Sequence, residues 1–175
     1  MPDVWLITPQ VFPDDRGEFL ETWRADQFRD LGIDVDFAQD NQSLSRRGVL
    51  RGLHYQIAPD AQAKLVGAAV GEVIDVVVDL RQSSPTFGEW AGRTLSASDH
   101  QMLWIPMGFA HGFLALTESA LVLYKTSAPY SAASERTIRW DDPTLGIEWP
   151  EVEGGPLLSA KDAAAEAFTD ADLFS

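Results

Sequence analysis

Residues 49–56, VLRGLHYQ, place a histidine and an arginine in an apolar stretch of the chain. His54 is one of only three histidines, and Arg51 precedes it by three positions. An unperturbed imidazole has a pKa of about 6.5, so it can accept a proton at neutral pH. The residues alone allow two interpretations: a packed histidine on a buried strand, which is the commoner case, or a general base beside an anion-binding arginine.

The spacing of these two side chains sets a condition on the second interpretation. Side chains alternate along a strand, so Arg51 and His54 would face opposite sides of a regular one. Gly52 lies between them, and a bulge or bend at that glycine would turn both toward one cavity. We therefore expect an irregular strand here if the two residues act together.

The chain is acidic overall, with 13 Lys and Arg against 27 Asp and Glu and a formal net charge of -14. A nucleic-acid partner needs a broad basic surface, so we expect none. Residues 41–64 are an exception, because four cations there face one acid, Asp60, a balance of 4 − 1 = +3. Such a local basic cluster favours a small anionic ligand, with a solvated arginine-rich loop as the alternative.

Several classes of chemistry have no motif in this sequence. Cysteine is absent, which excludes disulfides, thiolate nucleophiles and cysteine metal sites. There is no G-x-G-x-x-G after a strand, no Walker loop, no H-E-x-x-H and no G-x-S-x-G, so NAD, P-loop and serine-hydrolase functions lack support. No signal peptide or 18-residue apolar run is visible, and we expect a cytoplasmic protein without membrane contact.

A metal site is the main competing interpretation of the histidines. Residues 106–113, PMGFAHGF, are similar to the second half of the cupin sequence pattern, in which His111 would enter the barrel. A cupin metal site usually gathers several histidines and a glutamate, with two histidines one residue apart. Here Gln56 stands where a second histidine would follow His54. A metal centre commonly needs three or four protein ligands, so we predict none.

Short strands must position these residues, because long helical periodicity is scarce. Residues 72–80, EVIDVVVDL, have a period of 2, which predicts a strand with one packed face and one half-polar face that carries Asp75 and Asp79. Turn signals recur about every ten residues and include Gly92 and Gly112. This pattern indicates an antiparallel sandwich or barrel, with further strands predicted over residues 102–106, 112–116 and 120–126.

One helix is predicted over residues 24–31, with Gly32 placed where a C-terminal glycine cap belongs. The tail is expected to form one or two helical turns around residues 163–168. No repeat or linker divides the chain, so we expect a single domain over residues 1–175, with a core over about 11–162 and a tail over 163–175.

The residues go beyond a generic sandwich and resemble those of the dTDP-4-dehydrorhamnose 3,5-epimerase family. The motifs occur in the family's order from about residue 11 to residue 162. The resemblance implies an all-β, cupin-like jelly-roll barrel with a few short helices, usually a homodimer, that works without a metal or an organic cofactor. The segments that carry it are DDRGEFLETW (14–23), QDNQSLSRRGVLRGLHYQ (39–56), AKLVGAAVGEVIDVVVDLRQSSPTFGEW (63–90), LWIPMGFAHGFLAL (103–116) and RWDDPTLGIEWP (139–150).

The implied substrate is the dTDP-sugar dTDP-4-dehydro-6-deoxy-D-glucose, whose ketone at carbon 4 acidifies the protons on carbons 3 and 5. Epimerisation then needs a base on one face, an acid on the other and a cation at the carbonyl oxygen, where such stabilisation is worth ~10²–10³ in rate. The resemblance implies that His54 is the base, that Asp162 fixes its tautomer, and that Tyr124 is the proton donor. Lys64 and Arg51 are the cations expected near the keto oxygen and the diphosphate.

Further residues match substrate contacts in the family. Tyr130 matches an aromatic side chain that stacks on the thymine ring. Without the resemblance, Tyr124 would be interpreted as a buried strand tyrosine, Arg16 and Glu21 as an ordinary ion pair, and His111 as a structural histidine. His100 matches nothing, and we expect it at the surface in a turn. The other matched contacts are Arg16, Glu21, Gln39, Asp40, Asn41, His111, Glu135 and Lys161.

Three alternatives share much of this pattern. A relative that inverts only carbon 3 or only carbon 5 would use the same base and acid, and the family departures at Gly67 and Ala133 leave room for that outcome. A ketoisomerase within the sugar-nucleotide cupins is disfavoured by RGLHYQ together with LYK. A non-catalytic cupin-like binding module would tolerate the loss of His54 or Asp162, and both are present.

Overall fold

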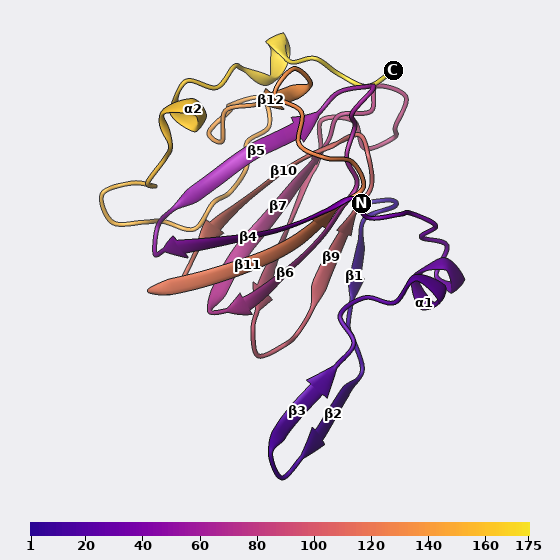
Figure 1. Ribbon diagram of the computed structural model, residues 1–175. Coiled ribbons are helices and arrows are strands. Elements are labelled where there is room, and N and C mark those ends of the chain that lie inside the picture. The colour runs from indigo at the N-terminus through magenta and orange to yellow at the C-terminus, as the bar shows by residue number, and fades with distance from the viewer.

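The computed structural model, which describes residues 1–175, consists of two five-stranded antiparallel sheets, a separate hairpin and short helices (Figure 1). The first sheet contains, in spatial order, β1 (Trp5–Ile7), β9 (Met102–Ile105), β6 (Lys64–Val70), β11 (Ser119–Thr126) and β4 (Gln39–Arg46). The second contains β12 (Glu135–Thr137), β5 (Leu50–Gln56), β10 (Phe109–Ala115), β7 (Glu72–Asp79) and β8 (Trp90–Ser96). The hairpin pairs β2 (Val11–Asp14) with β3 (Gly17–Leu20).

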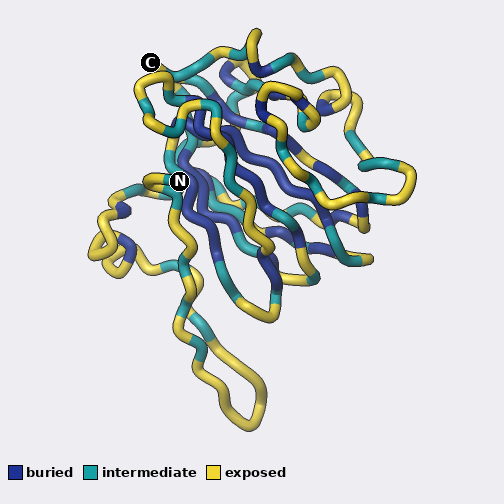
Figure 2. Tube along the Cα trace, turned by 180° about the vertical axis from the view of Figure 1, so that it is seen from behind, coloured by how far each residue is buried: buried dark blue, intermediate teal, exposed yellow.

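The main hydrophobic core lies between the two sheets. Val66 and Val122 from the first sheet pack in one cluster with Val77 and Phe113 from the second. Figure 2 shows that the buried residues follow the sheets, whereas the hairpin β2–β3 is exposed along most of its length. The predicted all-β architecture with a few short helices is therefore confirmed.

Strand β7 corrects the expectation of a half-polar face at residues 72–80. Val73 and Val77 face the core between the sheets, while Val76 and Val78 pack against the chain that follows β12. Asp75 and Asp79 are 0% exposed. The C-terminal segment, far away in sequence, covers the face of Val76 and Val78. Asp75 and Asp79 lie by alternation on the face of Val73 and Val77, which is turned toward the core between the two sheets, so both aspartates are interior.

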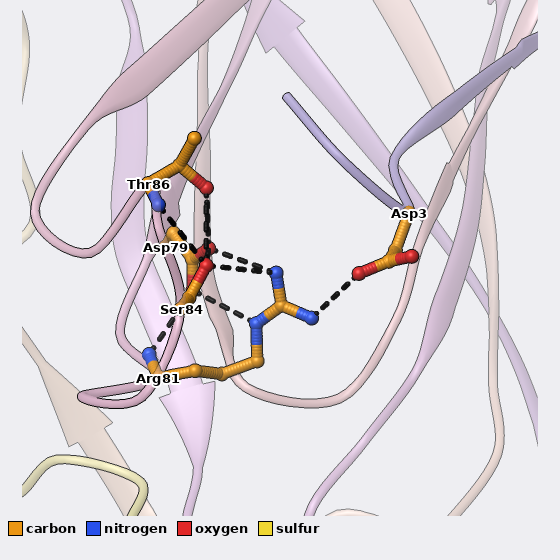
Figure 3. A network of polar contacts seen from close by, with 5 residues as sticks. All are labelled: Asp3, Asp79, Arg81, Ser84 and Thr86. Atoms are coloured by element: carbon orange, nitrogen blue, oxygen red, sulfur yellow. Dashed lines mark hydrogen bonds and ion pairs between the residues drawn. The ribbon is translucent and has the colours of Figure 1, made fainter.

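Asp79 is held by a dense polar network at the end of β7 (Figure 3). Its carboxylate accepts hydrogen bonds from the Arg81 guanidinium at 2.8 and 2.9 Å, from Ser84 Oγ at 2.6 Å and from Thr86 Oγ1 at 2.8 Å. Arg81 also donates to Asp3 at 2.8 Å and lies over the Phe109 ring. The network attaches the N-terminus and the loop after β7 to the second sheet.

Two glycines that were predicted to mark turns lie inside strands. Gly92 is part of β8 and Gly112 is part of β10. A Cβ atom at Gly112 would lie 2.8 Å from the carbonyl oxygen of Arg51 and 3.0 Å from Cα of Gly52. Gly112 therefore serves a close approach of two strands, which is the other common role of a strand glycine.

The helices are short, and each covers part of a sheet. α1 (Ala25–Asp30) agrees with the predicted helix, and Gly32 follows it with a φ of 86°. Phe28 of α1 packs with Met102 and Trp104 of β9. The C-terminal segment contains α2 (Ala160–Ala163) and a 3-10 turn at Phe168–Asp170, on either side of the predicted 163–168 region. No helix in the chain is long and apolar enough to cross a membrane.

Candidate active site

A cavity of about 290 Å³ opens between the two sheets and collects most of the residues expected to carry the chemistry. Both sheets contribute to its wall. The expected residues that line it are Gln39, Asn41, Arg51, His54, Lys64, His111, Tyr124, Tyr130 and Glu135.

An irregularity in β5 brings Arg51 and His54 to this cavity. His54 pairs with His111 of β10, and Arg51 pairs with Phe113. Three steps along β5 thus match two steps along β10, which is a β-bulge. Gly52 lies within it at a φ of 139°, a conformation that favours glycine. The bulge expected at this glycine is confirmed, and it explains how residues of odd spacing share one cavity.

His54 forms a close pair with a buried carboxylate. The distance from its Nε2 to Asp162 Oδ1 is 2.6 Å, and Asp162 is 3% exposed. A carboxylate only accepts hydrogen bonds, so Nε2 carries the proton and Nδ1 is free to accept another. Burial lowers the pKa of His54 below its ordinary value, although the Asp162 charge acts in the opposite direction. The imidazole is therefore neutral at pH 7, as a base must be.

Asp162 is delivered by the C-terminal segment. Its backbone N–H is capped by the side chain of Ser159 at 3.1 Å, at the start of α2. The segment is attached to the second sheet by parallel bridges between Val49 and Leu157 and between Ile138 and Glu166. These contacts hold the carboxylate over His54, which lies 108 positions away in sequence.

Lys64 is the buried cation of the cavity. Its Nζ donates to the backbone carbonyl of His54 at 3.2 Å, and the residue is 7% exposed. Burial lowers the pKa of Lys64 to about 8, while the charges of Asp75 and Glu135 act to raise it. The ammonium form is thus still the major one at pH 7, and it has few competing hydrogen-bond partners.

Tyr124 approaches the cavity from the sheet opposite His54. It lies on β11, paired with Asn41 of β4 and Val66 of β6. Burial raises the pKa of its phenol, and the positive charge of Arg51 opposes that effect. The phenol is therefore protonated at neutral pH and able to donate a proton or a hydrogen bond.

Polar residues at the rim are connected to one another. Tyr130, which is 57% exposed, donates from its hydroxyl to Glu135 Oε2 at 3.0 Å, and Glu135 also pairs with Lys161. The amide oxygen of Gln39 accepts from the backbone N–H of Tyr130 at 2.9 Å. Gln39 then donates to Asn41 Oδ1 at 2.7 Å. An exposed aromatic ring with oriented amides beside it is suited to stacking and hydrogen bonding of a flat base.

Four of the expected contact residues do not line the cavity of their own chain, and one of them, Lys161, reaches its rim only through the pair with Glu135. Asp40 is directed away from it, because side chains alternate along β4, and it pairs with Lys125 at 2.8 Å. Arg16 is exposed in the hairpin turn and pairs with Asp14. Glu21, which follows the hairpin, pairs with Arg24 at 3.2 Å.

His100 differs from its expected place at the surface. Its side chain is only 20% exposed, and its Nε2 lies 3.0 Å from Glu18 Oε1 of β3. The backbone φ of 54° agrees with a turn. The hairpin covers this histidine, an arrangement that no local sequence signal reveals.

Some residues of the cavity were not found from the sequence. Ser43 and Phe113 line it, and Asp75 lies behind it, paired with His111 Nε2 at 2.8 Å. Ser43 stands two positions after Asn41, so the period of the strand alone would have placed it on the same face. The sequence could also have indicated Asp75, because it is a carboxylate within a valine-rich strand.

Each histidine of the cavity is paired with its own carboxylate. His54 and His111 face each other across β5 and β10, but one contacts Asp162 and the other Asp75. Nowhere in the chain do three side chains of His, Cys, Asp or Glu gather at metal-binding distances.

Comparisons with known proteins agree with this geometry. Residues 1–170 match the family described as dTDP-4-dehydrorhamnose 3,5-epimerase. The chain is 55% identical to the dTDP-4-dehydrorhamnose 3,5-epimerase of Pseudomonas aeruginosa, over 99% of this chain and 96% of the relative. It is 48% identical to that of Escherichia coli K12, over 91% of this chain and 86% of the relative.

Solved structures show the same arrangement of strands. The dTDP-6-deoxy-D-glucose-3,5-epimerase RmlC of Legionella pneumophila, in complex with dTDP-4-keto-L-rhamnose, is 46% identical with a TM-score of 0.94, over 98% of this chain and 91% of that one. ChmJ, a 3'-monoepimerase of Streptomyces bikiniensis in complex with dTDP-quinovose, is 38% identical with a TM-score of 0.88, over 95% of this chain and 84% of that one. The cupin-like jelly-roll fold expected from the sequence is confirmed.

Proposed function

The chain belongs to the dTDP-4-dehydrorhamnose 3,5-epimerase family, and we propose that the cavity between its sheets is where the epimerisation occurs. The protein is an isomerase of dTDP-rhamnose biosynthesis, which inverts carbons 3 and 5 of dTDP-4-dehydro-6-deoxy-D-glucose. One observation carries the assignment of the site. His54 and Tyr124 line a single cavity from opposite sheets, and a buried cation, Lys64, lies between the same walls.

The reaction assigned to these residues is proton transfer through an enolate. Nδ1 of His54 removes a proton from a carbon beside the ketone, and the resulting imidazolium is stabilised by Asp162. Lys64 donates a hydrogen bond to the developing oxyanion at carbon 4. The Tyr124 phenol returns a proton to the opposite face of the carbon, which inverts it.

Binding of the nucleotide is assigned to the rim and to the arginine of β5. Tyr130 would stack on the thymine, with Gln39 and Asn41 hydrogen-bonding its edge. Arg51 donates from Nε to Ser45 Oγ at 3.1 Å and from Nη2 to the Leu44 carbonyl oxygen at 3.4 Å, which leaves its Nη1 for the diphosphate. This placement directs the sugar toward His54 and Lys64, deeper in the cavity.

A homodimer would account for the residues that lie outside their own cavity. The hairpin that carries Arg16 protrudes from the jelly roll (Figure 1), and its Phe12 and Phe19 are 47% and 65% exposed. The outer face of the first sheet also exposes Leu44 and Leu123. Apolar surface of this extent is typical of an interface, and a second copy would bring Arg16 and Glu21 to a substrate. A cytoplasmic location stays a prediction.

Deuterium exchange followed by proton NMR tests the function directly. The wild-type protein, incubated with dTDP-4-dehydro-6-deoxyglucose in heavy water, should incorporate deuterium at both carbon 3 and carbon 5. His54→Ala should slow exchange at both carbons by roughly 10²–10⁴ while keeping the wild-type circular dichroism spectrum. Full activity of that variant would contradict the assigned base.

Two other outcomes would change the function. Exchange at one carbon alone would make the protein a single-site epimerase, the activity named for ChmJ, which shares the fold. No exchange at either carbon by a folded protein that binds dTDP would leave a sugar-nucleotide binding module.

A further inference from the structure

Strand β7 buries two aspartates on the same face, but their surroundings differ. Asp79 is opposed by the Arg81 guanidinium and by two hydroxyl donors, so both of its oxygens are satisfied (Figure 3). Asp75 has one partner, His111 Nε2 at 2.8 Å, and its Oδ1 has no hydrogen-bond partner. No lysine or arginine pairs with Asp75 directly.

A buried carboxylate with an unpaired oxygen reduces the stability of a fold. An unsatisfied buried polar atom costs on the order of 1–3 kcal/mol, and more when it is charged. Asp75 is 0% exposed and lies among the valines of the core cluster, where an apolar residue of similar size would fit. The position of Asp75 beside the cavity points to a functional reason for a carboxylate there.

His111 connects Asp75 to the cavity. The imidazole lines the cavity wall and donates from Nε2 to Asp75, so the carboxylate fixes both the orientation and the proton of that nitrogen. Phe113, which also lines the cavity, pairs with Asp75 between β10 and β7. The carboxylate thus lies one side chain behind the cavity surface.

The negative charge of Asp75 acts on the Lys64 ammonium. Among the charges around Lys64, that of Asp75 raises the pKa of the ammonium group most, that of Glu135 raises it less, and that of Lys161 lowers it. The other titratable groups that line the same cavity are Arg51, His54, Tyr55, His111, Tyr124, Tyr130 and Glu135. Burial alone would leave the amine more easily deprotonated, and a neutral amine stabilises an oxyanion poorly.

We propose that Asp75 is a positioning residue of the epimerisation, a buried counter-charge that holds His111 against the cavity wall and keeps Lys64 as an ammonium facing the sugar carbonyl. This inference rests on the function proposed above for Lys64. It assigns a role to a residue that contacts no substrate and acts through its neighbours.

NMR titration of the lysines tests the proposal without using activity. The chain contains three lysines, at positions 64, 125 and 161, so protein labelled with ¹³C at lysine Cε gives few signals, which Lys125→Arg and Lys161→Arg assign. Asp75→Asn keeps an oxygen that can accept from His111 but removes the charge. We expect the Lys64 pKa to fall from about 8 by about one unit, with the alkaline limb of kcat/KM moving down equally.

Asp79→Asn is the matched control, because it changes a buried aspartate on the same face of the same strand. It should lower the melting temperature, since the Arg81 network is lost, and leave the Lys64 titration unchanged. If Asp75→Asn does not fold, Asp75→Leu provides the same loss of charge with apolar packing.

The titration separates failure of this proposal from failure of the proposed function. An unchanged Lys64 titration in the Asp75 variants, or an equal shift in Asp79→Asn, would overturn the role of Asp75. Absence of deuterium exchange by the wild-type protein would overturn the epimerase site instead. In that case the Lys64 titration would still decide whether Asp75 sets the charge of the cavity.

Discussion

The acid–base residues of the cavity require opposite protonation states at the same pH. His54 must be neutral to accept a proton, and Lys64 must be charged to stabilise the enolate. Burial lowers the pKa of both groups, that of His54 below 6.5 and that of Lys64 to about 8. The interval between the two values is where both requirements hold.

The pH dependence of kcat/KM should therefore be bell-shaped. Activity should fall at low pH as His54 gains a proton, with a midpoint below 6.5, and at high pH as Lys64 loses one, with a midpoint near 8. Initial rates measured between pH 5 and pH 10 check this. Lys64→Arg, whose cation does not titrate in this range, should lose the alkaline limb; a limb that stays would assign it to another group.

Asp162 should matter through the imidazolium that forms during turnover. Asp162→Asn keeps the capped turn at Ser159 but removes the charge beside Nε2, so kcat should fall roughly 10–100-fold with a smaller change in KM. The control is Asp172→Asn, because Asp172 lies on the same C-terminal segment as Asp162. This variant loses the ion pair between Asp172 and Arg136 of β12 and should retain kcat. Equal losses in both variants would indicate a displaced segment.

The contact between β5 and β10 determines whether these groups converge. A Cβ atom on Gly112 would meet backbone atoms of Arg51 and Gly52 at 2.8 and 3.0 Å, and backbone cannot move away as a side chain can. Gly112→Ala should lower the free energy of unfolding by about 1–3 kcal/mol and reduce kcat, because the bulge that carries His54 must shift. Urea denaturation measures the first effect.

Gly92→Ala is the matched variant for this contact. Gly92 lies in β8 of the same sheet, and the atoms nearest to an added Cβ are side-chain atoms at 3.3 to 3.6 Å. A loss below about 1 kcal/mol with normal kcat is expected. A larger loss there than at Gly112 would contradict the importance of the β5–β10 approach.

Single elements were predictable where the local pattern and the final burial agree. The helix before Gly32 and the strand at residues 120–126 have local signals that the structure follows. Gly112 was predicted to mark a turn at the start of the strand over residues 112–116, whereas β10 begins at Phe109, because a strand glycine and a turn glycine look alike until the partner strand is known. The face of β7 that carries Asp75 and Asp79 was misread because its cover is the first sheet, which is assembled from strands elsewhere in the chain.

The candidate site was predictable mainly from the family resemblance. Periodicity would place Ser43 with Asn41, but nothing local joins His54 to Asp162 or His111 to Asp75. Those pairs depend on how the sheets face each other and on the course of the tail. A single domain over residues 1–175 stays a prediction.

At the scale of the whole molecule, the proposed dimer can be tested through the position of Arg16. Arg16→Ala and His54→Ala should each be nearly inactive as pure proteins. If Arg16 acts on the cavity of the partner, a mixed dimer of the two variants contains one intact site, with His54 from one chain and Arg16 from the other. Equal amounts of both chains, unfolded and refolded together, should then recover about a quarter of wild-type activity, since half of the dimers are mixed and each has one working site in two.

The same mixture distinguishes the other arrangements. If Arg16 serves its own chain, no dimer contains an intact site, and the refolded mixture stays as inactive as its components. Sedimentation velocity on the wild-type protein supplies the independent measurement, because a monomer would exclude any sharing of sites. The hairpin would then need to fold back over its own jelly roll to bring Arg16 to the substrate, a movement that fluorescence energy transfer between labels on the hairpin and on β4 would detect when dTDP is added.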